Sequence, residues 1–338
     1  MESTLGSLNA FALYSALAAL TFWPVGLSGQ TCQTSGELDD ATRTAITTAG
    51  QRYFAMAAKG DVSSLRQSSI ASLAADFSAV ENRVKGHQEE LSGAQATVRS
   101  SFLLDASGSV PIPHAEFLCG VFGKNGQTAN SAAFYLNNLP ASKYAVVLLD
   151  AASAKGRTTV SAVLQQAGTD WRLADLYVSS AQIAGHDGDW FAARAREYKA
   201  KGQLHNAWFY YLQARSLTSP LPFMDTLATD KLYDEWHSLQ PADLPADGKT
   251  VDLAGPSASH KLTAVFPAAV GSDLDLVVKY QSSNVSNNNL AYQDNVSVIK
   301  AFVTKYPEVR DAFAAVVARA VAESGQDYGT LLAMKDIK

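Results

Sequence analysis

The chain has 338 residues, of which 47% are hydrophobic and 17% charged, and its formal net charge is −5 at pH 7. This length exceeds what one small core can organise, so two or three domains are expected. The negative balance, without a basic stripe to neutralise phosphates, argues against a nucleic acid partner. Two cysteines are too few for a disulfide scaffold or a cysteine-rich metal site.

Residues 1–36 are interpreted as an export signal followed by a flexible segment. No charged side chain lies between Glu2 and Glu37, and residues 10–27 are almost wholly apolar. A secretory signal normally begins with positive charge, which is missing here, so a retained membrane anchor is the alternative. The 18 apolar residues fall just short of a hydrocarbon core of about 30 Å. The segment therefore predicts an extracytoplasmic protein that is periplasmic, secreted or lipid-anchored.

Cys32 follows this segment and leaves three states open. The residues from Leu27 to Cys32 resemble the acylation site of bacterial lipoproteins, in which a small residue precedes the modified cysteine. Thr31 before the cysteine and Leu27 five positions back depart from that pattern. Cys32 is therefore predicted as a candidate lipid-attachment site and membrane tether, with a disulfide to Cys119 and a free thiol as the alternatives.

Residues 37–183 are predicted to form an α+β domain. Residues 38–59 have helical spacing with acidic residues at the start, and the Lys-Gly-Asp at 59–61 ends this helix and caps a second one that runs to Val80. After Gly93 the hydrophobic period changes to two, which predicts an antiparallel meander. Its strands are expected at 98–104, 115–122, 131–136, 144–149, 158–165 and 171–178.

This domain resembles the NTF2-like (cystatin-like) superfamily in two short patterns. Tyr53 to Asp61 is similar to the end of that family's first helix, and Gly168 to Leu173 to the turn before its last strand. The resemblance implies a cone-shaped fold with a pocket between sheet and helices, in a superfamily that holds both enzymes and binders. The pocket candidates for ligand binding are His114 and Tyr144, with Asp105 and Glu116 as further polar occupants. No residue matches a catalytic motif of the family, so no catalytic residue is predicted.

Residues 184–240 are predicted to be helical and resemble a single tetratricopeptide repeat. The resemblance depends on small and aromatic residues at the repeat's spacing, namely Ala195, Tyr198, Gly202, Ala207, Tyr211 and Ala214. Trp208, Tyr210 and Tyr211 form an aromatic-rich stretch that either binds a ligand or packs between domains. In the cluster at 185–189, Asp187 or Asp189 is expected to cap the helix that starts at Trp190, with a cation site as the alternative.

Residues 241–249 are interpreted as a linker and 250–338 as a small α+β domain. Strands are expected at 261–266 and 274–280, a helix at 295–306, a helical segment after Pro307 and a last hairpin turning at 325–327.

The sequence lacks a phosphate loop, a zincin motif, a nucleophile elbow and a dinucleotide fingerprint, so no cofactor and no metal are predicted. The leading hypothesis is an exported bacterial envelope protein that serves as a non-catalytic binding or scaffold module. Its partner would be a protein, a peptide or a small apolar ligand. The alternative is a hydrolase or isomerase acting in the NTF2-like pocket. A structural subunit, indicated by the apolar segment 316–321, is a third hypothesis.

Overall fold

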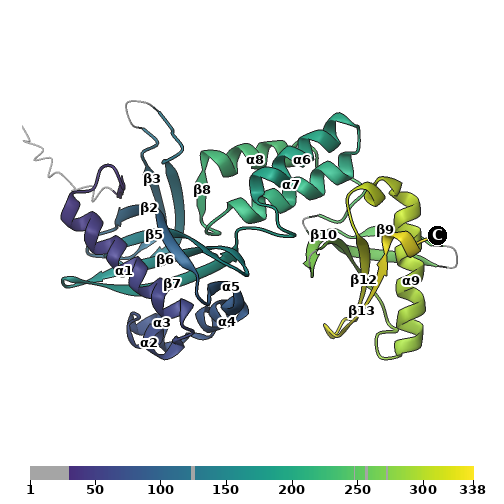
Figure 1. Ribbon diagram of the computed structural model, residues 1–338, viewed down its shortest axis with the longest axis horizontal. Coiled ribbons are helices and arrows are strands. Elements are labelled where there is room, and N and C mark those ends of the chain that lie inside the picture. Colours follow the sequence, from purple (N-terminus) through teal and green to yellow (C-terminus); the bar gives the residue numbers. More distant parts are fainter. Residues whose placement is uncertain (1–29, 123–125, 247, 256–257, 272) are drawn as a thin grey trace, which may run out of the picture.

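The computed structural model describes residues 30–122, 126–246, 248–255, 258–271 and 273–338. The predicted export signal up to Gly29 lies outside these residues. The fold is mixed α+β, as predicted. Figure 1 shows a sheet with helices from the first half of the chain, a helical segment in the middle, and a second sheet with its own long helix.

The first half of the chain forms a five-stranded antiparallel sheet with the order β1-β2-β5-β6-β7. Its strands are β1 (Thr31–Thr34), β2 (Gln95–Asp105), β5 (Lys143–Ser153), β6 (Gly156–Ala167) and β7 (Asp170–Ser180). Five helices cover one face, and these are α1 (Asp40–Ala58), α2 (Val62–Gln67), α3 (Ala71–Ala75), α4 (Ser78–Gly86) and α5 (Gln88–Leu91). The predicted second helix, which runs to Val80, is therefore divided among α2, α3 and the start of α4. The chain breaks after α2 because Ile70 donates its backbone N–H to Leu173 of β7 at 2.8 Å.

The space between α1 and the sheet is filled by an apolar core. Ile46 and Tyr53 of α1 pack with Val147 of β5, and the hydroxyl of Tyr53 donates to the backbone oxygen of Trp171 at 3.0 Å. This is the space in which the NTF2-like resemblance implies a pocket. Side chains fill most of it, and an opening of about 270 Å³ at its edge is lined by residues of α1, β2, β5, β6 and β7.

The expected single meander is wrong, because two of its strands leave the sheet. β3 (Ile112–Cys119) and β4 (Ala132–Leu139) pair with β8 (Met224–Thr226) in a separate sheet of order β3-β4-β8. This small sheet packs on the face of the first sheet that the helices leave free, through the cluster that contains Phe102 and Phe134. β5 explains the second layer: residues 144–149 are all buried, so both faces of this strand need a cover.

The middle segment contains α6 (Gly188–Ala200), α7 (Leu204–Thr218) and α8 (Leu227–His237). α6 and α7 form the predicted antiparallel hairpin, and Gly202 turns it with a φ of 76° that favours glycine. The N-cap prediction for α6 is confirmed at Asp187, whose side chain accepts from the backbone N–H of Trp190 at 3.1 Å. α7 also packs on the last sheet, and the two share one apolar core.

The last third of the chain forms a five-stranded sheet of order β13-β12-β11-β10-β9. β11 and β12 are parallel neighbours in this sheet, and α9 (Asn288–Lys305) connects them along the chain. Its elements are β9 (Val251–Ala254), β10 (Ser259–Val270), β11 (Asp273–Gln281), the 3₁₀ turn η1 (Pro307–Asp311), β12 (Ala315–Val321), β13 (Asp327–Ala333) and η2 (Met334–Asp336). The strands predicted at 261–266 and 274–280 and the final hairpin are confirmed. The apolar segment 316–321 lies in β12, inside the sheet, and its buried residues form part of the hydrophobic core. Within the described part of the chain, no helix is long and apolar enough to cross a membrane.

Candidate functional site

A cavity of about 410 Å³ lies where the first sheet, the β3-β4-β8 sheet and the helical segment meet. Its volume falls within the roughly 300–1,000 Å³ typical of small-molecule sites. Residues from β2, β5, the loop before β4, the end of α7, β8 and the start of α8 line it. These are Arg99, Ser100, Phe102, Ala129, Asn130, Ser131, Leu148, Thr218, Pro220, Met224, Thr226, Leu227, Ala228 and Lys231.

A bulge in β2 brings Arg99 to this cavity. Val98 pairs with Leu149 and Ser100 pairs with Leu148, so Arg99 is an extra residue in the ladder. Val98 packs toward the helices, whereas Phe102, four residues later, lies in the core on the opposite face. Strict alternation would put both on the same face. The bulge adds one residue to β2, so that the consecutive residues Arg99 and Ser100 both line the cavity. Bulges near binding sites often redirect a side chain in this way.

The opposite wall is the start of α8, which a capping box fixes in place. The Thr226 hydroxyl accepts from the backbone N–H of Thr229, and the Thr229 hydroxyl accepts from that of Thr226 at 2.7 Å. The first residues of the helix, Leu227 and Ala228, then face the cavity together with Lys231 one turn later. Leu227 is 46% exposed although it is a large apolar residue. The wall therefore offers apolar surface that the chain does not cover by itself.

The charges at the cavity are of one sign. Arg99 and Lys231 are the only charged side chains among the described lining residues. Arg99 lies 3.4 Å from Asp150, and both side chains of that pair are about two-fifths exposed, so the contact is weak. Asp225 of β8 alternates with the lining residues Met224 and Thr226 and is not among the lining residues. Burial and the charge of Asp230 raise the pKa of Asp225.

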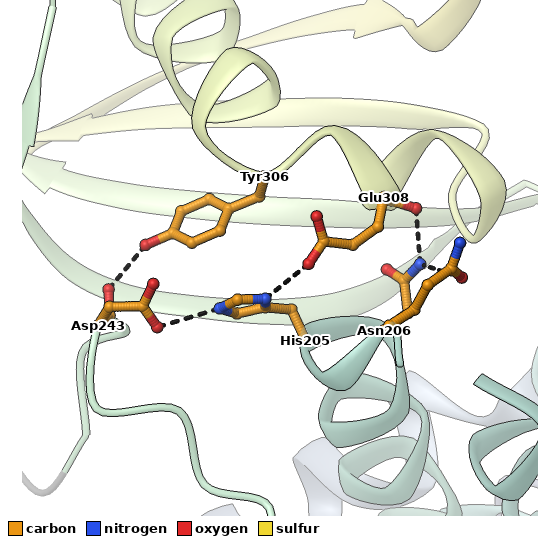
Figure 2. A network of polar contacts seen from close by, with 6 residues as sticks. His205, Asn206, Asp243, Tyr306 and Glu308 are labelled. Carbon is orange, nitrogen blue, oxygen red and sulfur yellow. Dashed lines mark hydrogen bonds and ion pairs between the residues drawn. The ribbon is translucent and has the colours of Figure 1, made fainter. Parts of the chain in front are cut away.

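Apart from the cavity, a network of polar contacts joins α7, the predicted linker and the segment at residues 306–308 that precedes β12 (Figure 2). His205 at the start of α7 contacts Glu308 through Nδ1 at 2.7 Å and Asp243 through Nε2 at 3.0 Å. The side-chain amide of Asn206 donates to the backbone oxygen of Glu308, and the hydroxyl of Tyr306 donates to that of Asp243. We call these five residues the His205 network.

The His205 network is built to hold the elements together. Both ring nitrogens of His205 are engaged by carboxylates, one from the predicted linker and one from η1, so the ring connects α7 to both segments. Burial opposes ionisation of Asp243, but the hydrogen bond and charge of His205 outweigh it and hold the pKa of Asp243 below its usual value. The segment predicted as a linker is therefore anchored at Asp243.

The aromatic residues predicted to bind a ligand are buried. Trp208 and Tyr210 are each 5% exposed and Tyr211 is 1% exposed. The Tyr210 hydroxyl donates to the backbone oxygen of Ala312 at 2.7 Å, and Trp208 stacks on Trp236 with the ring centroids 6.0 Å apart. These contacts correspond to the packing alternative, in which the aromatic stretch joins the helices to the last sheet.

The polar residues expected in the NTF2-like pocket are not brought together. His114 is exposed on β3 and contacts Asn137, and Glu116 is exposed on the same strand. Tyr144 is buried in the core between the two sheets, where its hydroxyl donates to the backbone oxygen of Pro140 and burial raises its pKa. Asp105 lies at the end of β2, 3.5 Å from Lys143. None of them lines the cavity described above.

Cys32 is bonded to Cys119, so β1 is covalently attached to β3. Their Cα atoms are 4.9 Å apart, and Cys119 is fully buried. Of the three states that the sequence left open, the structure has the disulfide. Lipid attachment at Cys32 is incompatible with this state, because the thiol that would be acylated forms the bond. A buried disulfide is compatible with an oxidising, extracytoplasmic location.

Sequence reasoning missed Arg99 and Lys231. The sequence shows no phase change at Arg99, because Ala96, Val98, Phe102 and Leu104 keep an even spacing, and the bulge appears only in the pairing of β2 with β5. Lys231 has no signal either, and it looks like an ordinary solvated residue on a helix until the neighbouring sheet is placed.

No group of three or more histidine, cysteine, aspartate or glutamate side chains in the described ranges is arranged to hold a metal ion. No family model, curated protein or solved structure matches the chain. The functional argument therefore depends on the geometry of the chain itself.

Proposed function

We propose that this protein is an exported envelope protein that acts as a non-catalytic binding module, with the cavity beside α8 as its ligand site. The observation that carries the proposal is this cavity, which combines apolar walls, a re-aimed strand residue and an exposed leucine at its edge. The apolar N-terminal segment and the buried disulfide support the extracytoplasmic location. The NTF2-like and tetratricopeptide-like resemblances remain proposals for the ancestry of the first two units.

The ligand class that fits is a small molecule with an apolar body. Phe102, Leu148 and Met224 form the floor of the cavity, and Leu227 and Ala228 form one wall. Removing about 100 Å² of apolar ligand surface from water contributes roughly 2.5 kcal/mol before the costs of association. Polar groups at Ser100 and Asn130 are available to orient the ligand.

Titration of the purified full-length chain with N-phenyl-1-naphthylamine, a neutral fluorophore that brightens in apolar surroundings, tests this function. We expect saturable binding of one probe per chain. Ala228→Trp should abolish it, because the indole would occupy the cavity. Ala193→Trp is the matched control, since Ala193 is also an exposed helical alanine but does not line the cavity. Absence of saturable binding, or equal binding to the Ala228 variant, would refute the proposed function.

A further inference from the structure

We infer that the ligand of this cavity is an amphipathic monoanion, an apolar chain that ends in a carboxylate, as in a medium-chain fatty acid. The inference rests on the proposed function and adds the chemistry of the ligand's head group. It follows from the placement of two cationic side chains and one helix start around a cavity whose other lining residues are apolar or uncharged polar.

The charge at the cavity contrasts with that of the whole molecule. The chain carries a net charge of −5, yet the described lining residues include Arg99 and Lys231 and no acid. The start of α8 adds the partial positive charge of a helix N-terminus at Leu227 and Ala228. Two elements, β2 through Arg99 and α8 through Lys231 and its N-terminal backbone, therefore favour a negative group on the ligand.

Arg99 is suited to a carboxylate in particular. A guanidinium presents a planar fork of N–H donors that matches the two oxygens of a carboxylate. Asp150 engages Arg99 through one nitrogen at 3.4 Å, which leaves most of its five donors for a ligand. Asp150 is not among the residues that line the cavity, so it adds no negative charge to the lining.

The apolar part of the site is suited to an alkyl chain. Its floor comes from the core between the two sheets, where Phe102, Leu148 and Met224 meet. Each methylene that leaves water there should tighten binding about four-fold. A molecule with only a charged head would leave these walls unused, and a neutral chain would make no use of the charges of Arg99 and Lys231.

Displacement of N-phenyl-1-naphthylamine by decanoate and by decanol tests the head group at constant chain length. We expect decanoate to compete at least 10-fold more strongly than decanol, since hydrogen bonds to charged groups contribute about 1.5–3 kcal/mol. Arg99→Gln should weaken decanoate about 10-fold and leave decanol unchanged. Arg172→Gln, at an exposed arginine of β7 outside the cavity, should change neither.

The outcomes separate the two proposals. Equal competition by decanoate and decanol, or a decanoate affinity that Arg99→Gln leaves intact, would overturn the carboxylate inference while the probe still binds. Loss of probe binding in Ala228→Trp would then still support the proposed function. Acetate is the control for the head group alone, and competition by acetate as strong as by decanoate would also overturn the inference, because the chain would contribute nothing.

Discussion

Reduction of the Cys32–Cys119 disulfide is expected to destabilise the first sheet strongly. The two cysteines are 87 residues apart in sequence, and the loop-entropy relation gives about 4.6 kcal/mol for closing a loop of that length at 25 °C. β1 has only four residues, so its pairing with β2 supplies little stability to replace the crosslink. Most of this cost should therefore appear as a lower free energy of unfolding of the sheet.

Hydrogen exchange of the β5 amides, measured by mass spectrometry with and without reductant, checks this expectation. β5 lies at the centre of the sheet, so its slowest amides report the opening of the whole unit. A loss of about 4.6 kcal/mol corresponds to exchange that is faster by roughly three orders of magnitude. The alkylated, reduced protein serves as the control for complete reduction. Unchanged exchange in β5 after verified reduction would refute the reasoning.

Three substitutions probe other parts of the fold, each by the free energy of unfolding in urea. His205→Phe should cost about 2 kcal/mol, because two hydrogen bonds to carboxylates are lost; an unchanged stability would show that the His205 network is dispensable. Asp275→Asn should stabilise the protein by about 1 kcal/mol at pH 7, because burial raises the pKa of this 2% exposed carboxyl and makes its ionised form unfavourable. The penalty of ionisation disappears as the pH falls through that pKa, so the stability gain should vanish near pH 3. A gain that persists at pH 3 would contradict the argument. Gly50→Ala should cost about 1–3 kcal/mol, since a Cβ there would lie 2.7 Å from Val147, whereas Gly86→Ala, with open space around it, should not destabilise; similar values for the two would count against close packing of α1.

Local signals predicted local structure well in this chain. Asp39 caps α1, as the acidic residues at the start of this helix indicated, and Asp61 of the Lys-Gly-Asp turn caps α2. The alternating segments became strands, and the helical hairpin turns at Gly202. These features depend on side chains and backbone groups within a few positions of one another, so the sequence contains the whole interaction.

The layer arrangement could not be predicted from the same patterns. An alternating strand such as β3 fits the edge of one sheet or a second sheet above it equally well, because period two states only which side is buried. The pairing of β4 with β8 joins residues about 90 positions apart, Phe134 with Met224. Without that pairing, Lys231 has no cavity to face, and the aromatic residues of α7 look as available for a ligand as for packing.

β8 is the element that connects the helical segment to the first half of the chain, and its position makes a last prediction. It pairs with β4 through Ala132 and Phe134, and the cavity begins where β8 passes into α8. A ligand that binds only when β8 is paired with β4 stabilises this paired state by about 2.7 kcal/mol at a concentration of 100 times its Kd. With N-phenyl-1-naphthylamine at that concentration, the amides of β8 and the first turn of α8 should exchange roughly 100-fold more slowly, since each 1.4 kcal/mol is a factor of ten. The exchange of the amides of β13, in the C-terminal sheet, should not change, so uniform slowing would indicate that the probe binds elsewhere. No slowing at β8 would show that the cavity does not depend on this strand.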